Sequence, residues 1–191
     1  MAETDPKVIT QQLEDLRTNY RLGRSISYES RVERLNRLKN AINSNRQAIA
    51  DALQKDLGRH KFASNVTIDG VIGNIELNIN NLKSWMKDEP AETSLIMLPG
   101  QSYIRKEPKG VVLCFGAWNF PFVTLLGPLV SIIASGNVAL VKPSEVSSHS
   151  VAVVKKILEE TDYDTIRVAI GGPKTAQELL KQRYDQIVYT G

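Results

Sequence analysis

The chain has 191 residues, of which 42% are hydrophobic and 24% charged, and its 24 Lys and Arg against 21 Asp and Glu give a net charge of +3. This length suffices for one domain, or for a small domain plus part of another, and the composition is that of a soluble protein without low-complexity tracts or repeats. Because the basic residues alternate with acidic ones along the predicted helices, the charge pattern argues against nucleic-acid binding.

Cysteine and histidine usage excludes further classes of protein. Cys114 is the single cysteine, so no internal disulfide can form, and a reducing, cytoplasmic compartment is expected. Its apolar neighbours predict a buried strand position, which favours a small hydrophobic role over that of a nucleophile. His60 and His149 are isolated from Cys114 and from each other in sequence, so no metal site is predicted. The first residues, MAETDPKVIT, have neither the features of a secretory signal nor those of a transit peptide.

The first ninety residues predict a series of amphipathic helices. Each helix has one apolar stripe at spacings of three and four and therefore needs a packing partner. The alternative interpretation of these ninety residues is a free-standing helical bundle that mediates protein interactions and has no catalytic role. The predicted helices or their apolar stripes span residues 6–23, 32–42, 44–58 and 68–86.

Two turn signals lie in this part of the chain. Ser44, with Gln47 three residues later, predicts a capping box that starts the third helix. Residues 91–107 predict two short strands around a turn in which Pro99 takes the second position and Gly100 the third. Such a hairpin is a weak indication of a bridging or assembly element. Residues 1–107 are therefore interpreted as N-terminal helices plus a bridging hairpin.

An apolar tract without Asp, Glu, Lys or Arg extends from Val111 to Val141. Its length and polarity allow a membrane helix as one interpretation. Glycine, proline and asparagine residues divide the tract, however, into a β-rich run, a turn, a helix-length segment and a second β-rich run. The order of these pieces favours a strand, a helix and a strand over a membrane span.

The second half of the chain alternates strands and helices with short loops between them. This pattern predicts a doubly wound, Rossmann-like α/β unit with a parallel sheet and right-handed crossovers. The strands are predicted at 111–115, 138–141, 165–170 and 186–189, and the helices at 121–134, 147–160 and 175–183.

Proline, glycine and serine set the predicted bounds of these helices. Pro121 opens the first helix, Pro128 kinks or restarts it, and Gly136 ends it. Ser147 or Ser148 caps the second helix.

Four loops follow the predicted strands, and ligands of such sheets bind at the carboxyl ends of the strands. Each of the four contains residues that can bind or activate a polar group. The loops are GAWNFP (116–121), KPSE (142–145), GGPKTA (171–176) and TG (190–191).

The first of these loops contains Trp118 and Asn119. Near a helix N-terminus the amide of Asn119 can donate to a developing oxyanion, a role worth about 3 kcal/mol. It can equally well be a plain N-cap, and the residues alone leave the two interpretations level. Trp118 either packs in the core, which is the favoured interpretation, or forms the wall of a ligand cleft.

The second and third loops offer groups that bind a nucleotide. Glu145 can accept hydrogen bonds from ribose hydroxyls and Lys142 can reach the same sugar or a phosphate, whereas the alternative is a solvated loop with an incidental ion pair. Gly171 and Gly172 allow close approach of the backbone, but GGPKTA is not the G-x-G-x-x-G fingerprint.

Taken together and in order, these motifs resemble a known family. EPKGVVLCFGAWNFPF, ASGNVALVKPSE, GGPKTAQELL and RYDQIVYTG are similar to segments of the NAD(P)-dependent aldehyde dehydrogenases. The class 3, fatty-aldehyde-type group is the most similar branch, because WN follows a small residue there instead of a proline. The resemblance extends back through WMKDEP and LGRHKFAS to about Ser27.

The resemblance implies a role for each loop. It makes Asn119 the oxyanion-hole donor, and Lys142 and Glu145 the contacts to the adenosine ribose, with Glu145 favouring NAD over NADP. It also implies an aldehyde dehydrogenase fold, which binds its dinucleotide without G-x-G-x-x-G, and a homodimer that oxidises a medium- or long-chain aldehyde to the acid. The residues that it places along the cofactor are Ala117, Trp118, Gly171, Gly172, Thr190 and Gly191.

The chain also departs from the family pattern. In the family, the TG turn is followed by a segment with a general-base glutamate and by a domain with the nucleophilic cysteine, and Cys114 cannot replace that cysteine. Residues 108–191 are therefore interpreted as the first half of a truncated NAD-binding domain, and the chain alone is expected to be inactive. A non-catalytic remnant that binds or regulates full-length subunits is the alternative, and a free-standing dinucleotide-binding module is a third. A membrane anchor in a C-terminal tail stays open.

Overall fold

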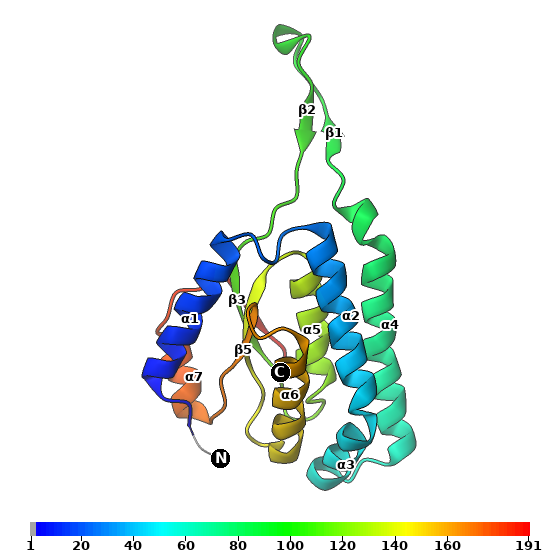
Figure 1. Cartoon of the computed structure of the whole chain (residues 1–191), viewed down its shortest axis with the longest axis vertical. Coiled ribbons are helices and arrows are strands. Elements are labelled where there is room, and N and C mark those ends of the chain that lie inside the picture. The colour runs from blue at the N-terminus through cyan, green and yellow to red at the C-terminus, as the bar shows by residue number, and fades with distance from the viewer. Residues whose placement is uncertain (1–2) are drawn as a thin grey trace.

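Four amphipathic helices occupy the first part of the chain in the computed structural model, which describes residues 3–191 (Figure 1). Their apolar stripes are buried, and the helices predicted from the spacing of apolar residues are confirmed. The fourth helix starts before its apolar stripe does. The bounds are α1 (Pro6–Arg21), α2 (Tyr28–Ser44), α3 (Arg46–Leu57) and α4 (Lys61–Trp85).

The capping box predicted at Ser44 is wrong. Ser44 is the last residue of α2, and Asn45 separates α2 from α3 without a side-chain bond to the N-terminus of α3. The Asn45 amide donates instead to the Ala41 carbonyl at 2.8 Å and to the Glu160 carboxylate at 3.0 Å. Contacts with another helix therefore decided the end of α2, and a local motif cannot show such contacts.

A two-stranded hairpin projects from the helices and the sheet (Figure 1). Its strands, β1 (Glu89–Ala91) and β2 (Ser102–Ile104), pair antiparallel, and η1 (Leu95–Met97), a short 3₁₀ helix, lies between them. The predicted pair of short strands is present, but the first strand lies almost entirely before the predicted range of 91–107, and the predicted turn positions are wrong. The Gly100 N–H donates to the Met97 carbonyl at 2.8 Å, so Gly100 closes the turn and cis-Pro99 takes the third position.

A parallel four-stranded sheet forms the second half of the fold, and helices cover both of its faces. The strand order is β5-β4-β3-β6, which is the order 3-2-1-4 of a Rossmann-like sheet when the strands are counted along the chain. The predicted doubly wound α/β fold is thus confirmed. The elements are β3 (Val111–Phe115), α5 (Val123–Ala134), β4 (Val138–Lys142), α6 (Ser148–Thr161), β5 (Ile166–Val168), α7 (Pro173–Leu180) and β6 (Gln186–Tyr189).

Two hydrophobic cores lie on the two faces of the sheet, because successive side chains of a strand point in opposite directions. Val112 and Cys114 belong to the larger core with α2 to α6, whereas Leu113 packs with α1 and α7 in the smaller one. Figure 1 shows α1 and α7 on one side of the sheet and the other helices opposite. The boundary between residues 1–107 and 108–191 stays a prediction, since side chains of both parts share the larger core.

The helix after β3 differs from its prediction at the start. It begins at Val123, because residues 121–122 form a turn, although the Phe120 carbonyl already accepts the Thr124 N–H at 2.9 Å. Pro128 lies inside one continuous helix and does not restart it. The predicted stop is confirmed, since Gly136 follows α5 with a φ of 82°.

The membrane interpretation of the apolar tract is wrong. Among residues 3–191, no helix combines the length and the hydrophobicity that crossing a bilayer requires. The tract forms β3, α5 and β4 instead, and it is apolar because it lies in the centre of the fold.

Asp56 of α3 caps the N-terminus of α6, a contact that the sequence did not indicate. Its carboxylate accepts the backbone N–H groups of Ser150 at 2.7 Å and His149 at 3.1 Å, and it lies 2.8 Å from the His149 ring. Ser147 is the N-cap residue, as predicted, but its hydroxyl makes no capping bond. Burial raises the pKa of Asp56, yet the hydrogen bonds from Ser150 and His149 outweigh burial, so the pKa lies below its ordinary value.

We expect Asp56→Ala to lower the free energy of unfolding by about 2 kcal/mol at neutral pH, because two N–H groups at the N-terminus of α6 lose their charged acceptor. A carboxylate whose pKa is depressed in the folded state stabilises the fold above its unfolded-state value of about 3.9. That contribution disappears as the pH falls through the lower folded-state pKa. Urea denaturation from about pH 7 to pH 3 should therefore show the difference between wild type and variant shrinking in acid. A difference independent of pH would contradict a role for the charge.

Candidate functional site

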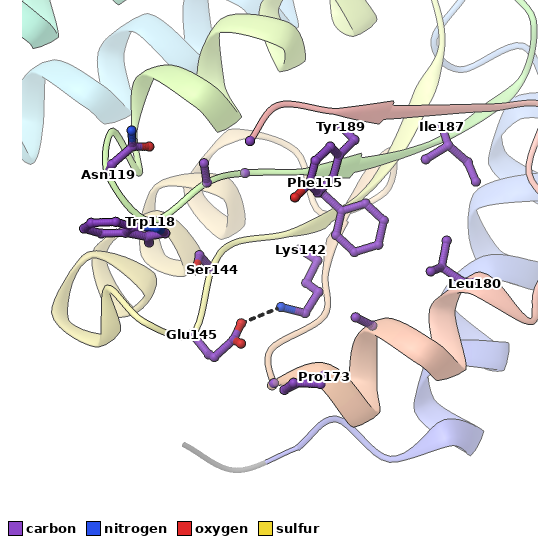
Figure 2. Close-up of a pocket in the computed structure, with 15 residues that line it drawn as sticks. Phe115, Trp118, Asn119, Lys142, Ser144, Glu145, Pro173, Leu180, Ile187 and Tyr189 are labelled. Atoms are coloured by element: carbon purple, nitrogen blue, oxygen red, sulfur yellow. Dashed lines mark hydrogen bonds and ion pairs between the residues drawn. The ribbon is translucent and has the colours of Figure 1, made fainter.

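A cavity of ≈ 650 Å³ opens at the carboxyl ends of the parallel strands (Figure 2). The loops after β3, β4, β5 and β6 all contribute to it, as expected for an open parallel sheet. The predicted site residues that line the cavity are Ala117, Trp118, Asn119, Lys142, Glu145, Gly172 and Gly191, whereas Gly171 and Thr190 do not line it.

Side chains of two helices hold the loop after β3 in place. The Ala117 N–H donates to Oγ1 of Thr124 in α5 at 2.9 Å. The hydroxyl of Ser147, at the start of α6, donates to the Trp118 carbonyl at 2.7 Å. Because consecutive residues of the loop are bonded to different elements, the loop has a defined shape without regular secondary structure.

Arg59, from the turn between α3 and α4, makes the next contact along this loop. One guanidinium nitrogen donates to the Asn119 carbonyl at 3.2 Å, and the guanidinium lies 4.3 Å from the centre of the Phe120 ring. Arg59 therefore binds the backbone of Asn119 and makes no hydrogen bond to the Asn119 side chain. Sequence reasoning missed this residue, because nothing in the first half of the chain signals a contact sixty residues away.

The side chains of Trp118 and Asn119 both lie at the cavity (Figure 2). Trp118 is 53% exposed and lines the cavity, so the favoured interpretation as a core residue is wrong, while its role as the wall of a ligand cleft stays a prediction. Asn119 does not cap α5, whose N-cap residue is Phe122, and the capping interpretation is also wrong. Within residues 3–191 no hydrogen bond engages the Asn119 amide, so it can donate to a ligand.

A close approach of the backbone explains the glycine before this loop. A Cβ atom at Gly116 would lie 2.8 Å from the Cβ of Leu125 in α5, closer than such contacts occur. A larger residue at this position would push the loop away from the helix that follows it.

Lys142, the last residue of β4, and Glu145 in the following loop form an ion pair that lines the cavity, drawn as a dashed line in Figure 2. Nζ of Lys142 lies 3.0 Å from Oε2 of Glu145, and the Lys142 side chain is only 5% exposed. The interpretation as a solvated loop is therefore wrong for Lys142. Burial raises the pKa of Glu145, but hydrogen bonds from its own backbone N–H and from Lys142 outweigh this effect, so the pKa lies below its ordinary value. Glu145 is thus an ionised acceptor at the end of β4.

The loop after β5 presents its backbone to the cavity at Gly172. Gly171 has a φ of 149°, and a Cβ there would lie 2.1 Å from the Thr175 hydroxyl, so this turn requires glycine. The sequence predicted that other groups approach the backbone closely at Gly171 and Gly172. The structure shows such close contacts, but the contacting groups are side chains of the same chain. Glu3 supplies one of them, since its carboxylate accepts the Gly172 N–H at 3.1 Å.

Several residues that sequence reasoning missed also line the cavity. Phe115, the last residue of β3, lies in register with Tyr189 of β6, and the two rings meet edge to face with their centres 6.1 Å apart. Register between parallel strands places such pairs together, and a single sequence does not show the register. Leu180 and Ile187 also line the cavity and lie outside the predicted loops. Gly116, Ser144, Pro173 and Ala176 belong to the predicted loops but were not singled out as site residues.

Cys114 is not a nucleophile. It is a free, fully buried thiol in the middle of β3, and burial raises its pKa to about 12. The thiol therefore remains protonated and packs as a small hydrophobic side chain, as predicted. Among the described residues, no three His, Cys, Asp or Glu side chains lie close enough together to hold a metal ion.

Comparison with known proteins agrees with this geometry. The model of the Aldehyde dehydrogenase family matches residues 1–191. Aldehyde dehydrogenase family 3 member B2 of Mus musculus is 36% identical over 181 residues, which cover 94% of this chain and 38% of the mouse protein. The dimeric NADP-preferring aldehyde dehydrogenase of Rattus norvegicus is 35% identical over 185 residues, which cover 96% of this chain and 41% of the rat protein.

A solved structure with the same arrangement is the substrate-bound state of Staphylococcus aureus AldH. It superposes with a TM-score of 0.90 at 34% identity and covers 94% of this chain and 40% of the AldH chain. The chain therefore spans about two fifths of the length of the relatives that it matches.

Proposed function

Because the chain belongs to the aldehyde dehydrogenase family, we propose that its cavity binds a nicotinamide dinucleotide and that the whole protein oxidises an aldehyde to the carboxylic acid. The observation that carries the proposal is the ion pair between the buried Lys142 and the half-buried Glu145, which lines the same cavity as Asn119. The resemblance of the sequence motifs to the fatty-aldehyde-type group supports a medium- or long-chain aldehyde as the proposed substrate.

The cavity suits the adenosine half of such a cofactor. Its volume of ≈ 650 Å³ falls in the range of small-molecule sites. Glu145 accepts from ribose hydroxyls and Lys142 stabilises that carboxylate, while the Trp118 side chain and the Gly172 backbone form walls. Thr190 and Gly191, which follow β6, would contact the pyrophosphate together with the loop at Gly171. When bound, the nicotinamide group accepts the hydride that the aldehyde loses.

Asn119 supplies the chemical contribution of this chain. Its amide makes no hydrogen bond to another described residue, and the loop that carries it is fixed by Thr124, Ser147 and Arg59. A preorganised amide donor stabilises the oxyanion that develops when a thiolate adds to the aldehyde carbonyl. The thiolate is not supplied within residues 3–191, since Cys114 is buried and protonated.

A binding assay and a turnover assay test the two parts of this proposal. The 191-residue chain should bind NAD in isothermal titration calorimetry, and Glu145→Ala should weaken binding by about tenfold, because ribose hydroxyls lose a charged acceptor. Glu14→Ala, on the exposed side of α1, is the matched control and should change nothing. The same chain should form no NADH from an aldehyde at 340 nm. Equal affinity of wild type and Glu145→Ala would refute the site, and robust turnover would refute the inactivity.

The hairpin supports a second proposal, which concerns assembly. Ile96 at its tip is 92% exposed and Leu95 85%, and the hairpin projects far from both cores (Figure 1). Exposed apolar groups on an extended arm favour contact with another subunit. We propose a homodimer for the whole protein, or association of this chain with full-length subunits as a regulator. Sedimentation of the chain with and without Ile96→Lys tests this, and a monomer in both cases would oppose it.

The single cysteine supports a proposal on location. A free, buried thiol such as Cys114 persists in a reducing compartment, and we propose the cytoplasm on this ground.

A further inference from the structure

Glu3 occupies the N-terminus of α7, beside the proposed cofactor cavity. Its carboxylate accepts the backbone N–H groups of Gly172 at 3.1 Å and Thr175 at 3.0 Å, and also the Thr175 hydroxyl. Hydrogen bonds from Thr175 and Gly172 hold the pKa of Glu3 below its ordinary value, so the group is ionised at neutral pH. The N-terminus of a helix favours an anion, and here a carboxylate of the chain itself is that anion.

The neighbouring residue fixes Glu3 in this position. Thr4 donates its N–H at 2.8 Å and its hydroxyl at 2.7 Å to the Ile170 carbonyl, and the Ile170 N–H donates back to the hydroxyl at 2.8 Å. Residues 3 and 4 are therefore bound to the loop after β5 and not merely close to it. This loop contributes Gly172 to the wall of the cavity.

Glu3 and Glu145 flank Gly172 from two sides. A Cβ atom built on Gly172 would lie 3.3 Å from Oε1 of Glu3 and 3.9 Å from Oε1 of Glu145. Glu3 precedes α1 and Glu145 lies in the loop after β4, and both carboxylates lie beside Gly172, which lines the cavity. They are close enough for Glu3 to raise the pKa of Glu145, although other contacts of Glu145 outweigh this effect.

The balance of charge near the two carboxylates is unfavourable for a further anion. Lys142 is the buried cation, but its ammonium group already binds Glu145 and the Pro143 carbonyl. Lys174 is a second cation near Glu3, but it is exposed and screened by solvent. The backbone donors at the start of α7, which could bind a phosphate, are bonded to Glu3.

We propose that Glu3 is a specificity-determining residue of the cofactor site, which disfavours a dinucleotide with a phosphate on the ribose 2′-hydroxyl. The inference rests on the proposed function, because it requires that Glu145 binds the adenosine ribose. A 2′-phosphate on that ribose would meet two carboxylates where it needs cations, and it would find the N-terminus of α7 occupied. The unphosphorylated dinucleotide meets no such repulsion.

Calorimetric titration of the full chain with NAD and NADP, which differ only in the 2′-phosphate, tests this role. Glu3→Gln preserves the size of the side chain and removes its charge. We expect this variant to bind NADP about five- to tenfold more tightly than wild type, with NAD affinity changed by less than about twofold. The gain should shrink as ionic strength rises. Glu3→Asp, which keeps the charge, should discriminate like wild type, and Glu14→Gln controls for a change of net charge elsewhere on the surface.

The outcomes separate the role of Glu3 from the proposed function. If wild type binds NAD and Glu3→Gln leaves the ratio of the two affinities unchanged, the role of Glu3 is refuted and the cofactor site stands. Equal effects of Glu3→Gln and Glu14→Gln would refute a local role in the same way. If neither dinucleotide binds to any of the proteins, the proposed function fails, and the inference fails with it.

Discussion

Asn119→Ala is expected to lower kcat for aldehyde oxidation by about 100-fold or more in a full-length enzyme of the family that carries these residues. The amide lies at the cavity, and its backbone carbonyl is bonded to Arg59, so the loop keeps its shape when the side chain is shortened. What disappears is one donor aimed at the oxyanion. Because that donor acts on charge that develops in the transition state, KM should change much less than kcat.

A chimera in which the 191 residues replace the corresponding part of the rat family 3 member A2 protein would allow this measurement. Steady-state rates should be compared for wild type, Asn119→Ala and Arg59→Ala. Arg59 holds the loop and does not reach the oxyanion, so Arg59→Ala should reduce kcat less, and Arg59→Lys should restore part of the loss. A kcat for Asn119→Ala within about threefold of wild type would show that another group stabilises the oxyanion.

The regular elements could be predicted from sequence because local patterns determine them. The apolar spacing in residues 6–21 and the β-branched run at 111–115 fix the element type wherever one face must be buried. The alternation of strands and helices predicts the doubly wound sheet. The rule that ligands bind at the carboxyl ends of parallel strands predicts the position of the cavity. These inferences needed no knowledge of distant contacts.

The errors occurred where distant contacts decide the outcome. Asn45 bonds to Glu160 of α6, and Asp56 caps α6 from α3, so neither helix end could be read from its own segment. The aromatic side chain of Trp118 favours a core position when the sequence alone is considered. Its exposure follows from the Ser147 hydroxyl, which binds the Trp118 carbonyl and holds the loop at the mouth of the cavity.

Glu3 shows the same limit at the site itself. An acidic residue near the start of a chain, before the proline that opens the first helix, is most simply a solvated charge. Only the fold brings it to Gly172 and Thr175, residues almost the whole chain away. The loops at the carboxyl ends of the strands can be predicted from sequence. The side chains from distant parts of the chain that contact these loops cannot.

Arg34→Ala is expected to lower the free energy of unfolding by about 3 kcal/mol, since it leaves a largely buried carboxylate without its partner. Nε of Arg34 lies 3.1 Å from Oδ2 of Asp162, with the two side chains 4% and 14% exposed, and Nη2 donates to the Asn137 carbonyl at 3.1 Å. Burial lowers the pKa of Arg34 to about 10 despite the attraction of Asp162. The cost of removing the Arg34 cation from water therefore exceeds the attraction within the ion pair. We attribute the expected loss of stability in Arg34→Ala to the unpaired carboxylate of Asp162 and to the cavity that the shortened side chain leaves.

The neighbouring ion pair of Arg24 and Asp164 provides the control for this experiment. Its atoms are 2.8 Å apart, but its side chains are 48% and 58% exposed, so Arg24→Ala should cost less than about 1 kcal/mol. Arg34→Met combined with Asp162→Asn should recover much of the stability lost in Arg34→Ala, because the double variant buries no unpaired charge. Urea denaturation at neutral pH measures all of these. Equal losses for Arg24→Ala and Arg34→Ala would mean that burial does not decide the outcome, and no recovery in the double variant would assign the loss to packing instead of charge.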